Sequence, residues 1–400
     1  CGCNRKIHMN FAVTTTEFHI FVQKKVYMIN REIYNSILAD FKRKKVIVLL
    51  GARQVGKTTL LEGLSSKEKK CLFLNCDNLD DKLLLEEKTS TELKLLLSSY
   101  EIIFIDEAQR VKNIGLTIKM IGDLKLAGQV IVTGSSSLDM ANEINEPATG
   151  RIIEYQLFPF SLSELAAHTS EREEQRLLEQ RMIYGLYPEV INEPTDSKRT
   201  LVTLANNYLY KDLFTYKGMK KPDILQKLVR ALALQLGSEV SYNELSNLLG
   251  VDRETVENYI NLLEKCFVVF RLDSFNRNLR NEIKKGKKVY FYDNGIRNAV
   301  ISNFAPLELR NDVGALWENL MVCERVKRNS YSKNFAIPYF WRTHDQKEID
   351  LVEDQDGILT TFEFKWNTKS KTSIPKIFAE TYPNSIFKVI TPDNFWEFVK

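Results

Sequence analysis

The sequence lacks several features that would mark a membrane or secreted protein. It contains no run of 18 apolar residues, which excludes a membrane-spanning helix of ordinary length. No basic segment followed by a short apolar stretch marks a signal peptide. The 6 cysteines include no Cys-x-x-Cys pair, so neither a zinc site nor a disulfide framework is indicated. These absences predict a cytoplasmic protein with reduced thiols.

An excess of one charge is also missing. The chain has 56 Lys and Arg against 52 Asp and Glu, a net charge of +4. No global basic field therefore attracts nucleic acid, and any such site must be local. The 400 residues, 44% of them hydrophobic, suffice for two or three domains with their own cores. Residues 1–27 show no clean periodicity, and we expect Met28 to be the natural start and this leader to be an upstream extension.

The most informative stretch begins with five apolar residues, 46–50, which are typical of a buried strand. Gly51 and Gly56 then enclose four residues, and Lys57-Thr58 opens a helical pattern. This is the G-x-x-x-x-G-K-[ST] pattern in its required strand–loop–helix setting. The glycines let backbone N–H groups point at phosphate oxygens, and the helix N-terminus adds positive charge. The stretch predicts a binding site for ATP and Mg²⁺.

Each side chain of the predicted site has a chemical role. Lys57 can reach the β- and γ-phosphates, and Thr58 can offer its hydroxyl to Mg²⁺. A second buried strand, 102–105, ends in Asp106 for the Mg²⁺ shell and Glu107 for the attacking water, although strands often end in acids. The residues that we expect to contact nucleotide are Gly51, Ala52, Arg53, Gln54, Val55, Gly56, Lys57, Thr58, Thr59, Thr133 and Ser135.

Thr133 and Ser135 follow a further buried strand, 129–132, and would lie near the γ-phosphate unless they belong to a plain serine-rich loop. Alternating strands and helices predict an α/β doubly wound parallel sheet with ligands at the carboxyl ends of its strands. Arg151 precedes another strand. It could be an arginine finger that acts on a neighbour's nucleotide in a homo-oligomer, or an ordinary surface residue.

These motifs together resemble an AAA+ ATPase. More narrowly, Arg53-Gln54-Val55, residues 133–135, residues 157–161 and residues 185–189 are similar to prokaryotic predicted AAA-type ATPases with a C-terminal domain of unknown function. The resemblance implies a P-loop core over 28–160, a helical lid over 161–219, ATP binding and ATP hydrolysis. The catalytic residues would be Lys57, Asp106, Glu107 and Arg151.

Residues 220–285 look like a winged helix. A helical pattern over 223–236, a short helix over 244–249, a helix capped by Asp252 and a strand follow in the expected order. A basic wing after them is a candidate for contacts with the DNA backbone, without sequence specificity. Its cations are Arg277, Arg280, Lys284, Lys285, Lys287 and Lys288. A structural or protein-binding module is the alternative, because the helix after Asp252 carries three glutamates that would repel DNA.

In residues 286–400, two alternating strands flank Asp356-Gly357, which is typical of a type I′ hairpin turn. This turn predicts strand pairs whose residue numbers sum to 713, so Asp350 lies opposite Glu363. Two carboxylates at that separation repel each other unless a cation lies between them. The same register places Glu348 opposite Lys365, an attractive pair.

Glu318, Asp350, Glu363 and Lys365 resemble the signature of the restriction-endonuclease-like fold. The resemblance implies carboxylates that hold Mg²⁺ and a lysine that activates water. A scaffold without activity and a solvated strand face are the alternatives. We therefore expect an ATP-hydrolysing protein that couples nucleotide state to a nucleic-acid-binding, nuclease-like module. The rival hypothesis is a nucleotide-switched adaptor whose C-terminal half binds protein.

Overall fold

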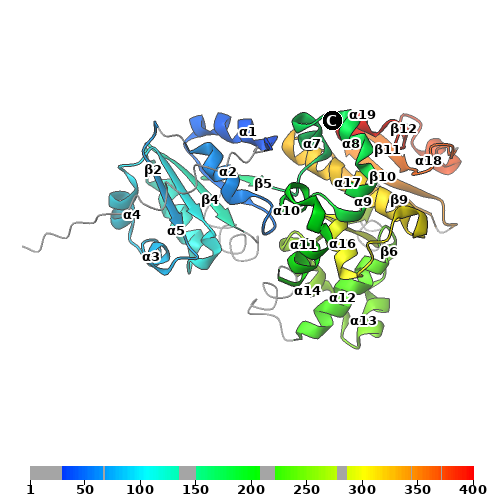
Figure 1. Ribbon diagram of the computed structural model, residues 1–400, viewed down its shortest axis with the longest axis horizontal. Helices are drawn as coiled ribbons and strands as arrows, with labels where there is room; N and C mark the ends of the chain where they lie inside the picture. Colours follow the sequence, from blue (N-terminus) through cyan, green and yellow to red (C-terminus); the bar gives the residue numbers. More distant parts are fainter. Residues whose placement is uncertain are drawn as a thin grey trace, which may run out of the picture.

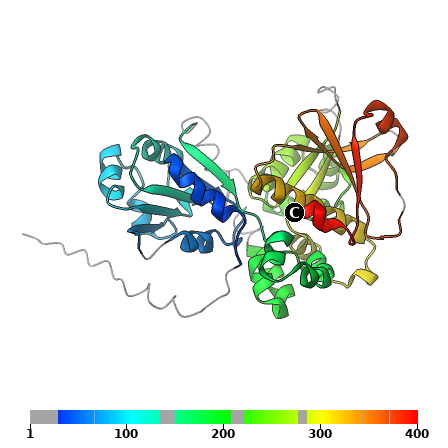
Figure 2. The same cartoon turned by 90° about the horizontal axis from the view of Figure 1, so that it is seen from above.

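The computed structural model describes residues 29–65, 68–134, 150–207, 221–276, 286–343, 345–370 and 372–400. They form two bodies, each built around its own sheet and joined by the chain that follows strand β5 (Figure 1). The view from above shows the same two bodies side by side (Figure 2). Some predicted residues lie outside the described ranges: the leader 1–27, Ser135, Arg277, Arg280, Lys284 and Lys285.

The first body is an α/β layer structure. Its elements are α1 (Ile33–Asp40), β1 (Val46–Leu50), α2 (Lys57–Leu64), β2 (Cys71–Asn75), α3 (Leu79–Leu83), α4 (Ser90–Leu97), β3 (Ile102–Asp106), α5 (Ile114–Asp123), β4 (Gln129–Gly134) and β5 (Ile152–Gln156). Among the described residues, five strands pair in parallel in the order β2-β3-β4-β1-β5. Every residue of β1, β3 and β4 is buried, which explains their continuous apolar runs. The predicted α/β class with a parallel sheet is confirmed.

The second body contains the rest of the described chain. Its helices are α7 (Leu162–His168), α8 (Glu171–Arg176), α9 (Leu178–Tyr184), α10 (Pro188–Asn192), α11 (Ser197–Leu204), α12 (Pro222–Leu234), α13 (Tyr242–Leu249), α14 (Arg253–Lys265), α16 (Asn294–Val300), α17 (Val313–Tyr331), α18 (Lys376–Thr381) and α19 (Phe395–Val399). Its strands are β6 (Glu239–Val240), β7 (Val269–Ser274), β8 (Lys287–Phe291), β9 (Ile337–Arg342), β10 (Glu348–Gln355), β11 (Ile358–Phe364) and β12 (Ile386–Ile390). No described helix has the length and apolar character needed to cross a membrane.

The second sheet continues across the boundary that we expected between residues 285 and 286. Within the described chain its seven strands follow the order β12-β11-β10-β9-β7-β8-β6. Strands β7 and β8, on either side of that boundary, pair antiparallel, and β7 also pairs with β9 in parallel. The strand that we assigned to a winged helix, β7, therefore belongs to the same sheet as the strands of the C-terminal region.

The helices between residues 162 and 204 lie in the second body together with that sheet (Figure 1). Helix α7 starts with a capping box in which the side chains of Ser161 and Glu164 satisfy each other's backbone N–H groups. Helices α9 and α11 pack against α16. Most of this segment, which we expected to be a lid, thus contributes to the core of the second body.

The hairpin between β10 and β11 has the predicted turn and register. Asp356 and Gly357 both have positive φ angles, 53° and 83°, as a type I′ turn requires. Leu351 pairs with Phe362, which gives the predicted sum of 713 and continues toward Asp350 and Glu363. The attraction that we expected between Glu348 and Lys365 is wrong in its partners, because Lys365 pairs with Glu363 and Glu348 pairs with Lys288.

Two glycines in this body provide a test of the turn. Gly357→Ala should lower the unfolding free energy by about 1 kcal/mol, because a Cβ there meets open space but forces a left-handed backbone on alanine. Gly314→Ala, in the first turn of α17 and equally open, should raise it by up to about 1 kcal/mol. Urea unfolding of both variants checks this, and equal effects would contradict the turn assignment.

Candidate functional site

The loop after β1 has a backbone that glycine makes possible. Gly56 has a φ angle of 94° and Gln54 one of 60°, so the chain curls back before α2 begins at Lys57. At Gly51 the restriction is steric, because a Cβ would lie 2.2 Å from the carbonyl oxygen of Leu157. Both glycines of the predicted pattern are therefore required by this geometry.

Lys57 lies buried inside the curl of this loop. Its ammonium donates hydrogen bonds to the carbonyl oxygens of Gly51, at 3.0 Å, and Ala52, at 2.8 Å. Burial lowers the pKa of Lys57 to about 8, and the carboxylates of Glu107 and Asp106 only partly oppose that shift. The ammonium is thus held where an anion in the loop would meet it.

The start of α2 and the carboxyl ends of β3 and β4 bring polar side chains to the same place. Thr58 donates its hydroxyl to Asp106 Oδ2 at 2.7 Å, and the Thr133 hydroxyl donates to Asp106 Oδ1. The backbone N–H of Glu107 donates to the Thr133 hydroxyl at 3.2 Å. Strands β3, β4 and β1 lie side by side and run parallel, so their carboxyl ends form one edge of the sheet. The residues that meet at this edge are Lys57, Thr58, Asp106, Glu107 and Thr133.

The donor set at this edge fits Mg²⁺. The Thr58 hydroxyl and the Asp106 carboxylate are hard oxygen donors, the kind that Mg²⁺ prefers, and they already converge. Asp106 is almost fully buried, with 3% of its surface exposed. A carboxylate at the entrance of an anion-binding loop is well placed to share a cation with that anion.

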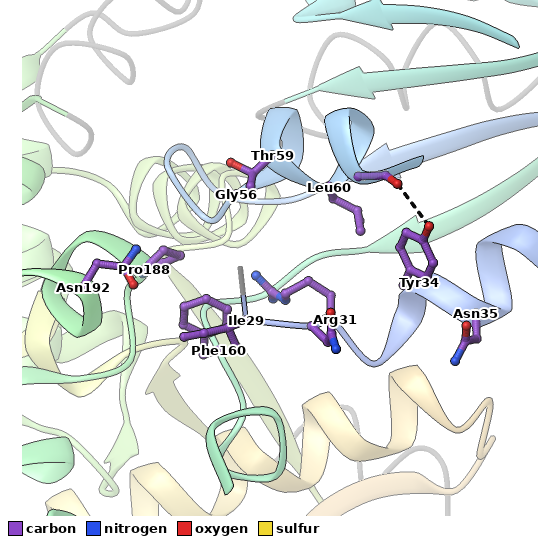
Figure 3. Close-up of a pocket in the computed structure, with 12 residues that line it drawn as sticks. Ile29, Arg31, Tyr34, Asn35, Gly56, Thr59, Leu60, Phe160, Pro188 and Asn192 are labelled. Carbon is purple, nitrogen blue, oxygen red and sulfur yellow. Dashed lines mark hydrogen bonds between the residues drawn. The ribbon is translucent and has the colours of Figure 1, made fainter. Parts of the chain in front are cut away.

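A cavity of about 430 Å³ adjoins the loop (Figure 3). Three parts of the chain line it: the segment that enters α1, the start of α2, and residues that follow β5. The lining residues are Ile29, Asn30, Arg31, Tyr34, Asn35, Gly56, Thr59, Leu60, Gly63, Phe160, Pro188 and Asn192. Its volume is within the range of pockets that bind small molecules. Only Gly56 and Thr59 were among the predicted site residues. Phe160 and Pro188 lie in the segments 157–161 and 185–189 that carry the family resemblance, but we assigned them no role in the site from the sequence.

Arg151 lies away from this edge. Its carbonyl accepts a hydrogen bond from the N–H of Val46, and Val46 pairs with Ile152, so Arg151 is at the amino end of the sheet. The five residues of β1 separate it from the loop by roughly 16 Å at about 3.3 Å per residue. Its guanidinium forms an ion pair with Asp123. The structure does not bring Arg151 to the phosphate loop of its own chain.

A second group of charged side chains lies in the second sheet. Glu318 of α17 accepts hydrogen bonds from Lys288 Nζ, at 2.9 Å, and from the Tyr290 hydroxyl, at 2.6 Å. Lys288 also forms an ion pair with Glu348. Burial, then the carboxylates of Glu318 and Glu363, raise the pKa of Asp350 well above its usual range. The predicted rise in a carboxyl pKa is therefore present, with burial as its largest cause and repulsion by Glu318 and Glu363 next.

This cluster contains lysines as well as carboxylates. Among the described residues, no three or more His, Cys, Asp or Glu side chains come together as a metal site requires. Lys288 already supplies a positive charge between Glu318 and Glu348, and Lys365 neutralises Glu363 at 2.7 Å. The structure brings Glu318, Asp350, Glu363 and Lys365 into one cluster, as we expected, and its binding of a metal ion stays a prediction.

Lys288 also corrects the predicted basic wing. Only 1% of its surface is exposed, so it cannot contact a DNA backbone. Lys287 forms an ion pair with Asp273. The sequence shows many positive charges in this region but not which side chains face solvent, because alternate residues of a strand point to opposite faces of the sheet.

Comparison with known proteins gives matches in three separate parts of the chain. Residues 43–166 match the family described as AAA domain. Residues 175–307 and 313–392 match two families described as domains of unknown function, DUF8612 and DUF4143.

Similar proteins from distant organisms are themselves uncharacterized. One from Haemophilus influenzae is 26% identical, over 85% of this chain and 88% of its own length. One from Methanocaldococcus jannaschii is 24% identical, over 88% of this chain and 81% of its own. One from Mycobacterium tuberculosis is 26% identical, over 84% of this chain and 72% of its own length. A solved Walker-type ATPase of Pyrococcus abyssi is 16% identical, with a TM-score of 0.46, over 68% of this chain and 96% of its own. The AAA match and the parallel sheet with its loop support a P-loop ATPase fold for the first body.

Proposed function

We propose that this chain binds ATP with Mg²⁺, hydrolyses it, and uses its nucleotide state to control what its C-terminal half binds. The observation that carries this proposal is the convergence of Lys57, Thr58, Asp106, Glu107 and Thr133 beside a cavity. Side chains that can bind phosphate, a metal ion and a water molecule lie together at this edge of the sheet. The adjoining cavity has space for a base and a ribose.

The roles of the side chains follow from their positions. The N–H groups of the loop and the Lys57 ammonium bind the β- and γ-phosphates. Thr58 and Asp106 would hold Mg²⁺, which when bound neutralises charge on the phosphate oxygens. Glu107 orients the attacking water, and Thr133 keeps the backbone of Glu107 in place through the hydrogen bond that its hydroxyl accepts.

The cavity supplies the remaining contacts of a nucleotide. Ile29 and Leu60 offer apolar surface, and Asn35 and Asn192 offer amide groups for hydrogen bonds. Asn192 belongs to α10 of the second body, whereas Leu60 belongs to α2 of the first. A nucleotide there would contact both bodies, so its binding and release can change how they sit together.

The two halves of the chemistry can be separated by substitution. Lys57→Ala should reduce ATP binding at least 100-fold, because it removes the buried ammonium (about 2.7 kcal/mol of phosphate binding). Glu107→Gln should bind ATP like the parent chain and lose hydrolysis, because it changes only the group that orients water. Binding of a fluorescent ATP analogue and phosphate release measure the two effects. Hydrolysis by Glu107→Gln at the parent rate would refute the role of Glu107.

The lowered pKa of Lys57 predicts a pH dependence of binding. In the free site Lys57 loses its proton above about pH 8, whereas bound phosphates favour the ammonium form. ADP binding should therefore weaken about tenfold between pH 7 and pH 9, and a proton should be taken up on binding at pH 9. Calorimetry in two buffers of different ionisation enthalpy measures that uptake. Binding without proton uptake at pH 9 would contradict the assignment.

For the C-terminal half, an adaptor is better supported than a nuclease. Glu318 and Glu348 share an ion pair with Lys288, and Glu363 pairs with Lys365, so lysines of the chain itself balance part of the negative charge. Lys288 is buried between Glu318 and Glu348, so a cation bound beside Glu318 would meet a positive charge that is already in place. Of the six expected wing cations, the two that the structure describes are buried or paired. We therefore propose that this half binds a protein partner under control of the nucleotide.

A metal titration tests the adaptor against the nuclease. Mn²⁺ should shift the melting temperature of the nucleotide-free chain and of Asp350→Asn equally, because Lys288 and Lys365 already pair with the glutamates around Asp350. The chain should not nick plasmid DNA, and DNA should not stimulate its ATPase activity. A Mn²⁺ shift that Asp350→Asn abolishes, together with nicking that Lys365→Ala abolishes, would establish the nuclease instead.

A further inference from the structure

Arg31 connects the phosphate loop to three other parts of the chain. Its Nη1 donates to the carbonyl of Val55 in the loop at 2.8 Å, and its Nη2 to the carbonyl of Phe158 at 2.5 Å. Its Nε donates to the Glu164 carboxylate at 3.0 Å. Figure 3 shows the side chain extended between the loop with Gly56 and the ring of Phe160, whose centroid is 4.7 Å from the guanidinium carbon. With 8% of its surface exposed, Arg31 is buried at the junction of the two bodies.

Helix α17 holds the segment that follows β5. Glu324 accepts a hydrogen bond from the N–H of Leu162 at 2.7 Å, and Lys327 donates to the carbonyl of Phe160 at 2.8 Å. The Tyr331 hydroxyl accepts from the N–H of Phe158 at 3.2 Å and from Arg31 at 3.4 Å. These three side chains are three and four residues apart, so they lie on one face of the helix. Three successive contacts therefore join α17 to this short segment.

The same segment contacts the phosphate loop directly. The N–H of Leu157 donates to the carbonyl of Leu50 at 2.7 Å, and the carbonyl of Leu157 packs so closely on Gly51 that no Cβ fits between them. Helix α17 thus reaches both ends of the loop. Its Tyr331 binds the N–H of Phe158, the residue after Leu157, which packs on Gly51, and Tyr331 also contacts Arg31, which binds Val55.

We infer that Arg31 is a positioning residue for the phosphate loop, and that helix α17 completes the nucleotide site through Tyr331. Nucleotide affinity is then set partly by the C-terminal half of the chain. This inference rests on the proposed ATP site and extends it, because neither Arg31 nor Tyr331 lies within the residues 43–166 that match the AAA domain. The coupling is reciprocal, so bound nucleotide must also stabilise the contacts of α17.

The chemistry of arginine explains why one residue can serve all these partners. A planar guanidinium has five N–H donors in fixed directions, and here it directs four hydrogen bonds to Val55, Phe158, Glu164 and Tyr331. A lysine keeps the positive charge beside Glu164, but its single nitrogen cannot reach the two carbonyl oxygens in that geometry. Arg31→Lys therefore separates charge from positioning.

The test compares three conservative variants of the full chain. Arg31→Lys should weaken binding of a fluorescent ADP analogue about tenfold, because the Val55 carbonyl loses its donor. Tyr331→Phe, which leaves every group of the loop intact, should weaken it about threefold. Tyr242→Phe is the matched control, since it removes a hydroxyl that accepts a 2.8 Å hydrogen bond from Arg271 within the second body. It should bind the analogue like the parent chain.

A second measurement distinguishes coupling from a general loss of stability. In the parent chain, ADP should slow amide hydrogen exchange in residues 324–331 of α17. Tyr331→Phe should abolish that nucleotide-dependent protection, whereas Tyr242→Phe should retain it. A merely structural role of Tyr331 would change exchange equally with and without ADP.

The outcomes separate this inference from the proposed function. If the parent chain binds the analogue and Lys57→Ala does not, the ATP site stands. Tyr331→Phe with parent affinity and parent protection would then overturn the inference alone. If Arg31→Lys fails to fold, the Tyr331→Phe result decides. If the parent chain binds no nucleotide, the proposed function fails and this inference fails with it.

Discussion

The packing of the Leu157 carbonyl on Gly51 is the contact on which the arrangement of this protein depends. It leaves no room for a side chain at Gly51, and it brings the end of β5 against the start of the phosphate loop. The residues that follow Leu157 lie against helix α17. Its side chains Glu324, Lys327 and Tyr331 form hydrogen bonds with the backbone of residues 158–162. A movement of the loop must therefore move this segment, because close-packed backbone does not deform continuously. The proposed communication between the two bodies follows from that contact.

Two buried lysines show how differently the two bodies treat positive charge. Lys57 is bonded only to neutral carbonyl groups, so burial dominates and lowers its pKa to about 8. Burial also disfavours the charge of Lys288, but the carboxylates of Glu318 and Glu348 outweigh it and raise the pKa of Lys288. Lys57 can therefore form an ion pair with an added anion, whereas Lys288 already forms ion pairs with carboxylates of the chain. This difference favours a site for an anionic ligand at Lys57 rather than at Lys288.

Local patterns predicted the elements closely. The strand before the phosphate loop, the acids at the end of β3 and the Asp356-Gly357 turn all lie where short-range chemistry indicates. A buried strand requires an apolar run, and a type I′ turn requires two positive φ angles, so each leaves a signal within a few residues. The boundary at residue 285 could not be judged in the same way, because nothing in the sequence of β7 or β8 states which sheet the strand joins.

The sequence by itself determined the phosphate loop, the class of the first body and the register of the β10–β11 hairpin. Tertiary structure alone decided that Arg31 meets Glu164, 133 positions later in the chain, and that Lys288 turns inward to Glu318 rather than outward to solvent. It also decided that Arg151 lies at the amino ends of the strands, whereas the loop lies at their carboxyl ends. The physical reason is common to all three. Charge and spacing are properties of the chain, whereas burial and partnership depend on which segments pack together.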